Sequence, residues 1–280
     1  MNKLMLLGGR SGQFYLMLRI KGLIGLLIVV FVLVLSVLVP LLSPHDPLWG
    51  GANEPLVSPN WSHLFGTDHL GRDVFTRTFA AGRIDILLAG IGVLIPLLIG
   101  AVVGSIIGTT RSAVVRRVWD SVIESLIIFP TLIIVIALVS ILGPGIKSIM
   151  VSLVATSWAR YARVARGRAL ALRESDFMLA TQCLGYSRTR VIFRHVIPNI
   201  RRVCLAFAIS DFVIVIIAIA GLSFLGAGVR PPEAEWGAMM ADARITMRIA
   251  PWTILFPSAT LAVSAVGFAL IANSMGGDHR

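Results

Sequence analysis

Long uncharged, apolar stretches alternate with shorter polar intervals along the whole chain. A bilayer core about 30 Å thick needs roughly 20 apolar residues in a helix, because lipid cannot hydrogen-bond unpaired backbone groups. The intervals are too short to form a separate globular domain. The pattern therefore predicts an all-α integral membrane protein with about six transmembrane helices, over residues 22–42, 84–110, 118–142, 146–164, 203–229 and 252–275.

Three of these stretches have irregular features. The first has the position of a signal peptide, but it is about 20 residues long and lacks a small-residue cleavage site, so we expect a retained helix. In the third, Pro130 predicts a kink. The fourth has only twelve uncharged residues between Lys147 and Arg160. It must therefore be short, shielded by neighbours, or continued as helix beyond the bilayer.

Charge decides the expected orientation. Charged residues make up 14% of the sequence, against about 25% in soluble domains, and the formal net charge is +11. Of the 25 Lys and Arg residues, 18 fall on one predicted side, ten of them between Arg160, near the end of the fourth stretch, and Arg202. By the positive-inside rule, both termini are cytoplasmic. The basic charge is thus a topology signal, and nucleic-acid binding is not expected.

This topology divides the chain into one transmembrane domain with short ends. The longest basic interval lies on the cytoplasmic side, where a soluble partner would meet the protein. The predicted parts are a cytoplasmic segment 1–21, a transmembrane domain 22–275 that contains an external loop 43–83, a cytoplasmic loop 165–202 and an external loop 230–251, and a cytoplasmic tail 276–280.

Motifs for catalysis, nucleotide binding and metal binding are missing from the sequence. It has no GxxxxGK[ST] phosphate loop and no GxSxG motif, so we expect no catalytic residue and no ATP site in this chain. Cys183 and Cys204 are too few and too far apart for a disulfide framework or a thiolate metal site. No paired histidine spacing such as HExxH occurs, so neither a metal site nor a bound cofactor is expected from His45, His63, His69, His195 and His279.

The cytoplasmic interval has the pattern of a helix, a glycine turn and a second helix. It reads RGRALALRESDFMLATQCLGYSRTRVIFRHVIPNI. Ser175 or Asp176 can cap a short helix, Gly185 lies where a helix ends in a left-handed residue, and Pro198 predicts a break before the chain re-enters the membrane. Two interpretations stay open: a face that docks on a partner, or a solvated basic loop.

This interval resembles the cytoplasmic coupling loop of ABC-importer permeases. That loop has the pattern EAA, three residues, Gly, nine residues, I-x-L-P. Aligned on Gly185, the triplet falls on Leu179, Ala180 and Thr181, and the last part on His195, Ile197 and Pro198. This sequence keeps four positions of the pattern: the middle alanine, the glycine, one aliphatic residue and the proline. The triplet's glutamate is absent, so its contact with the ATPase cannot be transferred to this chain.

Two further segments resemble signatures of the C-type permeases of dipeptide, oligopeptide and nickel importers. The first is LFGTDHLGRD before the second helix, with Gly66, Thr67, Asp68, Gly71, Arg72 and Asp73. The second is GLSFLGAGVRPPEAEWG after the fifth helix, with Trp236 and Gly237. A shortened N-x-x-GD segment closes the chain. Together these segments span nearly the whole sequence in the order of that family.

The resemblance implies a type I ABC-importer permease fold and a non-catalytic, multi-pass subunit of the cell inner membrane. It implies a homologous second permease, two ATPases that hold ATP and Mg, and an extracytoplasmic substrate-binding protein as partners. The expected function is import of di- or oligopeptides, with nickel or a metal chelate as the alternative. An ion-coupled secondary transporter is a rival that predicts paired intramembrane acids, whereas the sequence shows only isolated ones. A channel is disfavoured because no polar filter is visible.

The first signature permits two interpretations, a folded external cap or a set of substrate contacts. Gly66 and Gly71 allow tight turns, Asp68 can cap a helical turn, and Arg72 can pair with Asp73. In the second signature, Trp236 is expected at the membrane interface together with Trp252.

Small residues and isolated acids mark other positions inside the predicted helices. An acid within a span usually faces a cavity, a water path or a partner. Asp211 is therefore expected either in a structural ion pair or on the transport pathway, and the same two interpretations apply to Glu124. Spacings of four let a second helix approach closely, as between paired permeases, at some of Gly90, Gly92, Gly100, Gly104 and Gly108.

Overall fold

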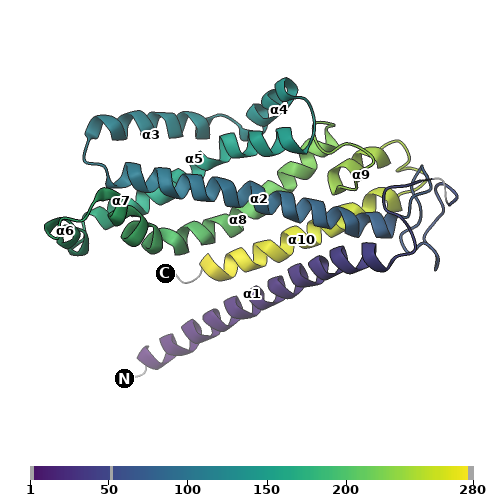
Figure 1. The fold of residues 1–280 in the computed structure, drawn as a ribbon. Coiled ribbons are helices and arrows are strands. Elements are labelled where there is room, and N and C mark those ends of the chain that lie inside the picture. The colour runs from purple at the N-terminus through teal and green to yellow at the C-terminus, as the bar shows by residue number, and fades with distance from the viewer. Residues whose placement is uncertain (1–2, 51–52, 277–280) are drawn as a thin grey trace. The chain divides into compact units, whose positions relative to one another are not determined.

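The fold is known from a computed structural model, which describes residues 3–50 and 53–276. The side chains of residues 3–17, 177, 179, 182 and 276 lie outside this description. In the described part the regular structure is helical (Figure 1). The helices are α1 (Lys3–Leu42), α2 (Val74–Thr109), α3 (Ala113–Ile128), α4 (Thr131–Leu142), α5 (Ile146–Arg173), α6 (Asp176–Cys183), α7 (Arg188–Val191), the π-helix η1 (Ile192–Val196), α8 (Ile197–Phe224), α9 (Trp236–Ala243) and α10 (Trp252–Gly276).

The chain forms two compact units. The first consists of Met1–Ala89 together with Ile209–Arg280, and the second is Gly90–Ala208. The helices α2 and α8 each run from one unit into the other.

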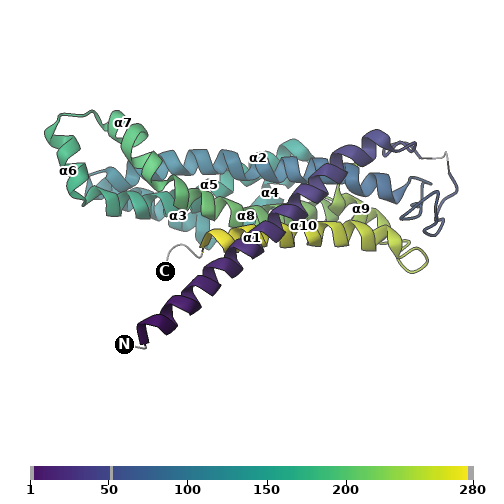
Figure 2. The same ribbon diagram turned by 90° about the horizontal axis from the view of Figure 1, so that it is seen from below.

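In the first unit, α1 packs along α10 (Figures 1 and 2). The contact is close because small residues face one another. A Cβ atom built on Gly25 would lie 2.5 Å from the carbonyl oxygen of Gly267, and one on Gly22 would lie 2.6 Å from Ser274 Oγ. Phe212 of α8 stacks on Phe268 of α10 with ring centroids 4.0 Å apart. Packing of small residues brings these backbones together without a long polar side chain between them.

In the second unit, a row of glycines on α2 packs closely against α5. A Cβ atom on Gly100 would lie 2.7 Å from the backbone nitrogen of Ala162, one on Gly104 would lie 2.8 Å from Ala165 Cβ, and one on Gly108 would lie 2.7 Å from Ala169 Cβ. The expected close approach at this spacing therefore occurs within the chain, against α5. At Gly90 the space around a Cβ atom is open.

The helix α3 also packs on α5. Ile107 and Ile123 are buried with Ala159 and Ala162 in one apolar cluster. At its edge, the Arg166 guanidinium of α5 pairs with the carboxylate of Asp120 on α3.

Among the residues that the structure describes, four helices are long and apolar enough to span a membrane: Leu18–Leu42, Val74–Thr109, Arg188–Phe224 and Trp252–Met275. The third predicted span is divided, because α3 and α4 meet at an angle of 86° around Phe129 and Pro130. The fourth is α5, which continues as helix to Arg173. The six-helix count is therefore approximate, and the protein is a multi-pass, all-α membrane protein.

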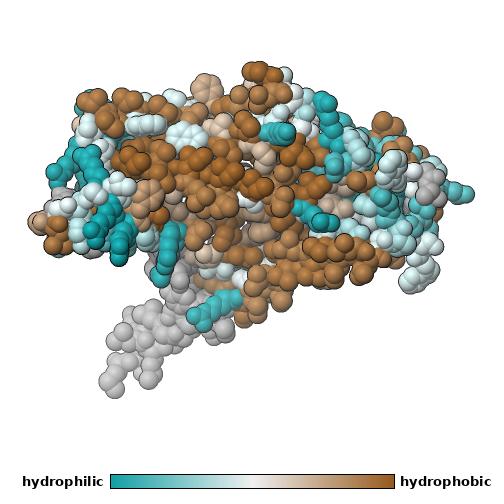
Figure 3. Space-filling view, in the orientation of Figure 1, coloured by the Kyte–Doolittle hydropathy of each residue, from teal (hydrophilic) through white to brown (hydrophobic). Residues whose placement is uncertain are grey.

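Exposed apolar side chains gather on the long helices, in the middle of the face that Figure 3 shows, as expected for a lipid-facing surface. Leu27 is 60% exposed on α1, Leu98 58% on α2, and Leu255 60% on α10. Such residues would be unfavourable in water, so lipid or another membrane subunit covers them.

Several helix and loop boundaries in the structure differ from those predicted from the sequence. The helix α2 begins at Val74, ten residues before the expected residue 84, so its first turns belong to the segment predicted as an external loop. The predicted loop 230–251 contains the helix α9. In the predicted loop 165–202, α5 extends to Arg173, and α7, η1 and α8 form a continuous helical segment. Pro198 does not break this segment, because it lies in the first turn of α8, directly after the π-helical turn.

Candidate functional site

The segment from α6 to α7 folds around Gly185 (Figure 2). Gly185 has φ of +67°, a left-handed conformation that side chains other than glycine adopt at a cost. The backbone N–H of Tyr186 donates to the carbonyl of Thr181 at 3.1 Å, which is the six-to-one bond of a Schellman cap. The prediction that a helix ends at Gly185 in a left-handed residue is confirmed.

The side chains of α6 divide into a buried and an exposed set. Thr181 is 3% exposed, and its hydroxyl donates to the carbonyl of Met178 at 2.8 Å. Ala180 and Cys183 are exposed. The side chain of Leu179, the first position of the triplet, lies outside the described residues. Ala180 is thus the triplet position whose exposed side chain a partner can contact.

The second half of the segment is held by local contacts. Ser187 caps α7, since its hydroxyl accepts from the backbone N–H of Arg190 at 3.3 Å. The guanidinium of Arg190 lies over the ring of Tyr186, with its central carbon 4.1 Å from the ring centroid. Ile197 and Pro198 follow in the first turn of α8, where Ile197 is half-buried and Pro198 is exposed.

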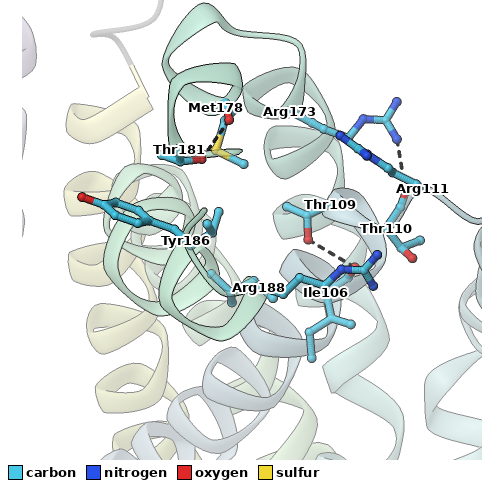
Figure 4. Close-up of a pocket in the computed structure, with 11 residues that line it drawn as sticks. Ile106, Thr109, Thr110, Arg111, Arg173, Met178, Thr181, Tyr186 and Arg188 are labelled. Atoms are coloured by element: carbon cyan, nitrogen blue, oxygen red, sulfur yellow. Dashed lines mark hydrogen bonds between the residues drawn. The ribbon is translucent and has the colours of Figure 1, made fainter. Parts of the chain in front are cut away.

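A pocket lined by arginine and hydroxyl side chains lies between the end of α2 and the α6–α7 segment (Figure 4). Its volume is about 330 Å³. Arg173 donates to the carbonyl of Thr110 at 3.2 Å, and Arg188 extends from α7 toward the end of α2. The lining residues are Ile106, Thr109, Thr110, Arg111, Arg173, Met178, Thr181, Tyr186, Arg188, Val191 and Ile192. The lining residues include three guanidinium groups and no carboxylate, and Arg173 Nη2 also lies 3.8 Å from Glu174 Oε1 beside the pocket. This charge favours an anionic group over a cationic one.

In the first unit, the LFGTDHLGRD segment folds on itself. Gly66 and Gly71 both have φ of +72°, as their predicted tight turns require. The Thr67 hydroxyl donates to the carbonyl of Glu54 at 2.7 Å and accepts from the backbone N–H of Val57 at 2.8 Å. Thr67 has no exposed surface, so this side chain stabilises the segment from within.

The charged residues of this segment form a buried network. Arg72 Nε lies 2.6 Å from Asp68 Oδ2, Arg77 Nε lies 3.6 Å from the same oxygen, and Arg72 Nη2 lies 3.4 Å from Asp242. The Arg72 and Arg77 side chains are each 3% exposed. The expected pair between Arg72 and Asp73 was wrong, because Asp73 instead caps α2 by accepting from the N–H of Thr76 at 2.8 Å.

A second set of buried charged residues lies at the first turn of α9. Glu235 accepts from the backbone N–H groups of Gly237 at 3.0 Å and Ala238 at 2.7 Å, while Asp85 of α2 accepts from the N–H of Trp236 at 3.0 Å. Both acids have no exposed surface, and their carboxyl groups are in contact. Burial raises the pKa of Glu235.

Trp236 is part of the same buried group. It has no exposed surface, and its indole N–H donates to the carbonyl of Thr78 at 2.8 Å. The expectation that Trp236 lies at the membrane interface was therefore wrong. Gly237 is needed for close packing, because a Cβ atom there would lie 2.7 Å from Ala220 Cα of α8.

The two isolated acids of the sequence differ in burial. Asp211 in α8 is 2% exposed, whereas Glu124 in α3 is exposed. Both interpretations given above for each residue remain predictions.

The comparisons with known proteins agree with the sequence signatures. The model of the family described as "Binding-protein-dependent transport system inner membrane component" matches residues 100–276. The chain is 32% identical over 263 residues to the oligopeptide transport system permease protein OppC of Bacillus subtilis, with 92% of this chain and 86% of the relative covered. It is 33% identical over 252 residues to the dipeptide transport system permease protein DppC of the same organism, with 90% and 78% covered. It is also 34% identical over 271 residues to a putative peptide permease protein of Brucella suis, with 95% and 88% covered.

Proposed function

Since the chain belongs to the family of binding-protein-dependent transport system inner membrane components, we propose that it imports di- or oligopeptides as the permease subunit of an ATP-driven importer. The proposed substrate class rests on the similarity to permeases named for oligopeptide and dipeptide transport. This similarity extends along most of this chain and of each relative. These names support peptides over the nickel or metal-chelate alternative.

The proposed complex contains this chain and a homologous second permease, which together form the translocation path. Two ABC ATPases would bind ATP and Mg on the cytoplasmic side, and an extracytoplasmic binding protein would deliver the peptide. The location of this chain would be the cell inner membrane with both termini in the cytoplasm, which the distribution of Lys and Arg supports. In this assignment the chain itself has no catalytic residue.

The α6–Gly185–α7 segment is the proposed docking surface for an ATPase. Ala180 is exposed on α6, and the turn at Gly185 sets the direction of α7 relative to α6. The neighbouring pocket, with Arg111, Arg173 and Arg188, complements an acidic side chain of the ATPase. Movement of the ATPases would then shift the permease helices between outward-open and inward-open arrangements.

A pair of substitutions at Gly185 tests this assignment. Gly185→Asn keeps a residue that tolerates positive φ, whereas Gly185→Glu adds backbone strain and a negative charge beside the arginine pocket. In proteoliposomes with all subunits, we expect Gly185→Asn to retain most peptide-stimulated ATP hydrolysis and transport. We expect Gly185→Glu to lower peptide transport at least tenfold while the chain still inserts and binds the second permease. Wild-type transport by Gly185→Glu would exclude this segment from coupling.

The substrate class needs a separate experiment. We expect mass spectrometry of the binding protein purified with the complex to find bound peptides. A nickel chelate in its place would support the metal alternative. Peptide uptake that persists without the ATPases but stops with an uncoupler would instead support the ion-coupled rival.

A further inference from the structure

Three residues of the connection between α1 and α2 meet beside the start of α2. His45 follows α1, His63 lies in the loop before α2, and Asp73 immediately precedes α2. One possible ligand atom from each residue lies within 4.8 Å of the others. The rings of His45 and His63 have their centroids 4.7 Å apart and are tilted by 36°. Two imidazoles and a carboxylate are a common ligand set for divalent transition metals.

Asp73 fixes the orientation of His63. Its Oδ2 accepts from the backbone N–H and the hydroxyl of Thr76, each at 2.8 Å, so the carboxylate is held in place by the first turn of α2. Its Oδ1 lies 2.9 Å from His63 Nδ1. An ion bound between these two atoms would take the place of the proton on Nδ1, with the ring proton then on Nε2, so that Nδ1 and Oδ1 both serve as ligands.

The group can be reached from outside the protein. The His63 side chain is 11% exposed and that of Asp73 is 2% exposed, but His45 is half-buried. His45 and Asp73 line a cavity of about 720 Å³, together with Trp61 and Ser62. The carbonyl of Ser62 lies 3.2 Å from His45 Nε2. An ion entering this cavity would therefore meet His45 first.

We propose that His45, His63 and Asp73 form a binding site for one divalent transition-metal ion, such as Zn²⁺. Ligand atoms around tetrahedral zinc, with bonds of about 2.0–2.1 Å, are roughly 3.4 Å apart. His63 Nδ1 and Asp73 Oδ1, which are 2.9 Å apart, would open by about 0.5 Å. Atoms as far as 4.8 Å apart would close by about 1.4 Å through rotation of the half-buried His45. Water would complete the coordination. This proposal does not depend on the proposed transport function, because metal binding to the chain can be measured without peptide or ATP.

Zinc binding to the purified full-length chain tests the proposal. The chain should carry an affinity tag without histidine, and Zn²⁺ should be titrated against a competing chromophoric chelator. We expect one ion per chain, and at least tenfold weaker binding in His45→Ala. His69→Ala is the matched control, because His69 is exposed in the same segment but outside the group, and it should bind as the wild type does.

A rescue variant separates metal binding from a structural role of His45. His45→Cys restores a zinc ligand but not the imidazole, so we expect it to recover binding that His45→Ala loses. With Co²⁺, the wild-type chain should show visible absorption of a four-coordinate ion, and His45→Ala should not. No saturable zinc binding in the wild type, or equal binding by His45→Ala, would overturn the proposal and leave the His63–Asp73 contact as a purely structural hydrogen bond.

Discussion

Two acids without exposed surface, Asp85 and Glu235, meet at the first turn of α9. They lie far apart in the sequence, on either side of 149 other residues, so the sequence shows them as isolated charges. The N–H groups of α9 stabilise negative charge, while burial opposes it. Protonation of Glu235 would remove the charge that burial opposes.

Glu235→Gln should reduce the loss of stability at high pH. Because burial raises the pKa of Glu235 above its ordinary value of 4.5, the folded state holds this proton more tightly than the unfolded state. Its contribution is therefore complete below that value and is lost as the pH rises through the raised pKa. We expect the Tm in detergent to fall with rising pH in the wild type and to fall less in the variant. Glu233→Gln, at an exposed position, should keep the wild-type slope; an equal slope in Glu235→Gln would contradict the prediction.

Asp68→Asn should strongly destabilise the LFGTDHLGRD segment before α2. The Asp68 carboxylate is paired with both Arg72 and Arg77, whose side chains are each 3% exposed. Removing one charge from a buried ion pair costs about 3–5 kcal/mol, because the remaining charge is uncompensated. The check is thermal unfolding in detergent. Glu54→Gln, at an exposed acid of the same segment, should unfold at nearly the wild-type temperature, and a similarly small effect of Asp68→Asn would show that the network contributes little.

At the scale of helices, the contact between α2 and α5 depends on the absence of side chains. Gly100, Gly104 and Gly108 lie one helical turn apart, opposite alanines and backbone of α5. The sequence predicted a close helix contact at this spacing but assigned it to a second permease. Spacing identifies the face of a helix, but it does not identify the helix that packs there.

Gly104→Ala should destabilise the second unit, whereas Gly90→Ala should not. The new methyl group at residue 104 would lie 2.8 Å from Ala165 Cβ, so the helices must separate, at a cost of about 1–3 kcal/mol. At residue 90 the space is open, and alanine favours a helix by about 0.5–1 kcal/mol relative to glycine. Thermal unfolding of the two variants in the same detergent provides the comparison. Equal Tm values would mean that α5 accommodates the methyl group.

The sequence predicted the ends of helices more accurately than it predicted contacts between distant segments. Gly185 has positive φ at the end of α6, as its position indicated, and the chain turns at Pro130. These outcomes depend on the residue itself and its immediate neighbours. The burial of Trp236 and the pairing of Asp68 with Arg72 depend on how distant segments pack, and a single sequence does not show that.

At the scale of the whole molecule, the fold class and family followed from the apolar stretches and three signatures. The number of helices was less certain from sequence, because α5 carries many arginines and α3 and α4 meet at 86°. The candidate site was found in part. Gly185 and the α6 segment were predicted, but the arginine pocket was not, since its residues come from α2, α5, α6, α7, η1 and the turns between helices.

Native cysteines allow the orientation to be tested. Cys183 is exposed on α6, and Cys204 is buried in α8. A membrane-impermeant maleimide should label Cys183 in inside-out vesicles but not in right-side-out vesicles, and bound ATPase should protect it. Cys204 should stay unlabelled in both. Ser58→Cys combined with Cys183→Ser should show the opposite sidedness, and labelling of Cys183 from outside would reverse the proposed topology.

The uninterrupted length of α5 sets the scale of movement available to the coupling segment. Its 28 residues form a rod about 42 Å long, with α6 attached through a two-residue turn at one end. A tilt of about 10° would displace one end by roughly 7 Å relative to the other while every backbone hydrogen bond within the rod is retained. Under the proposed function, a small change in the angle of α5 at a docked ATPase would therefore be enlarged along its length into a displacement of several ångströms at the opposite end.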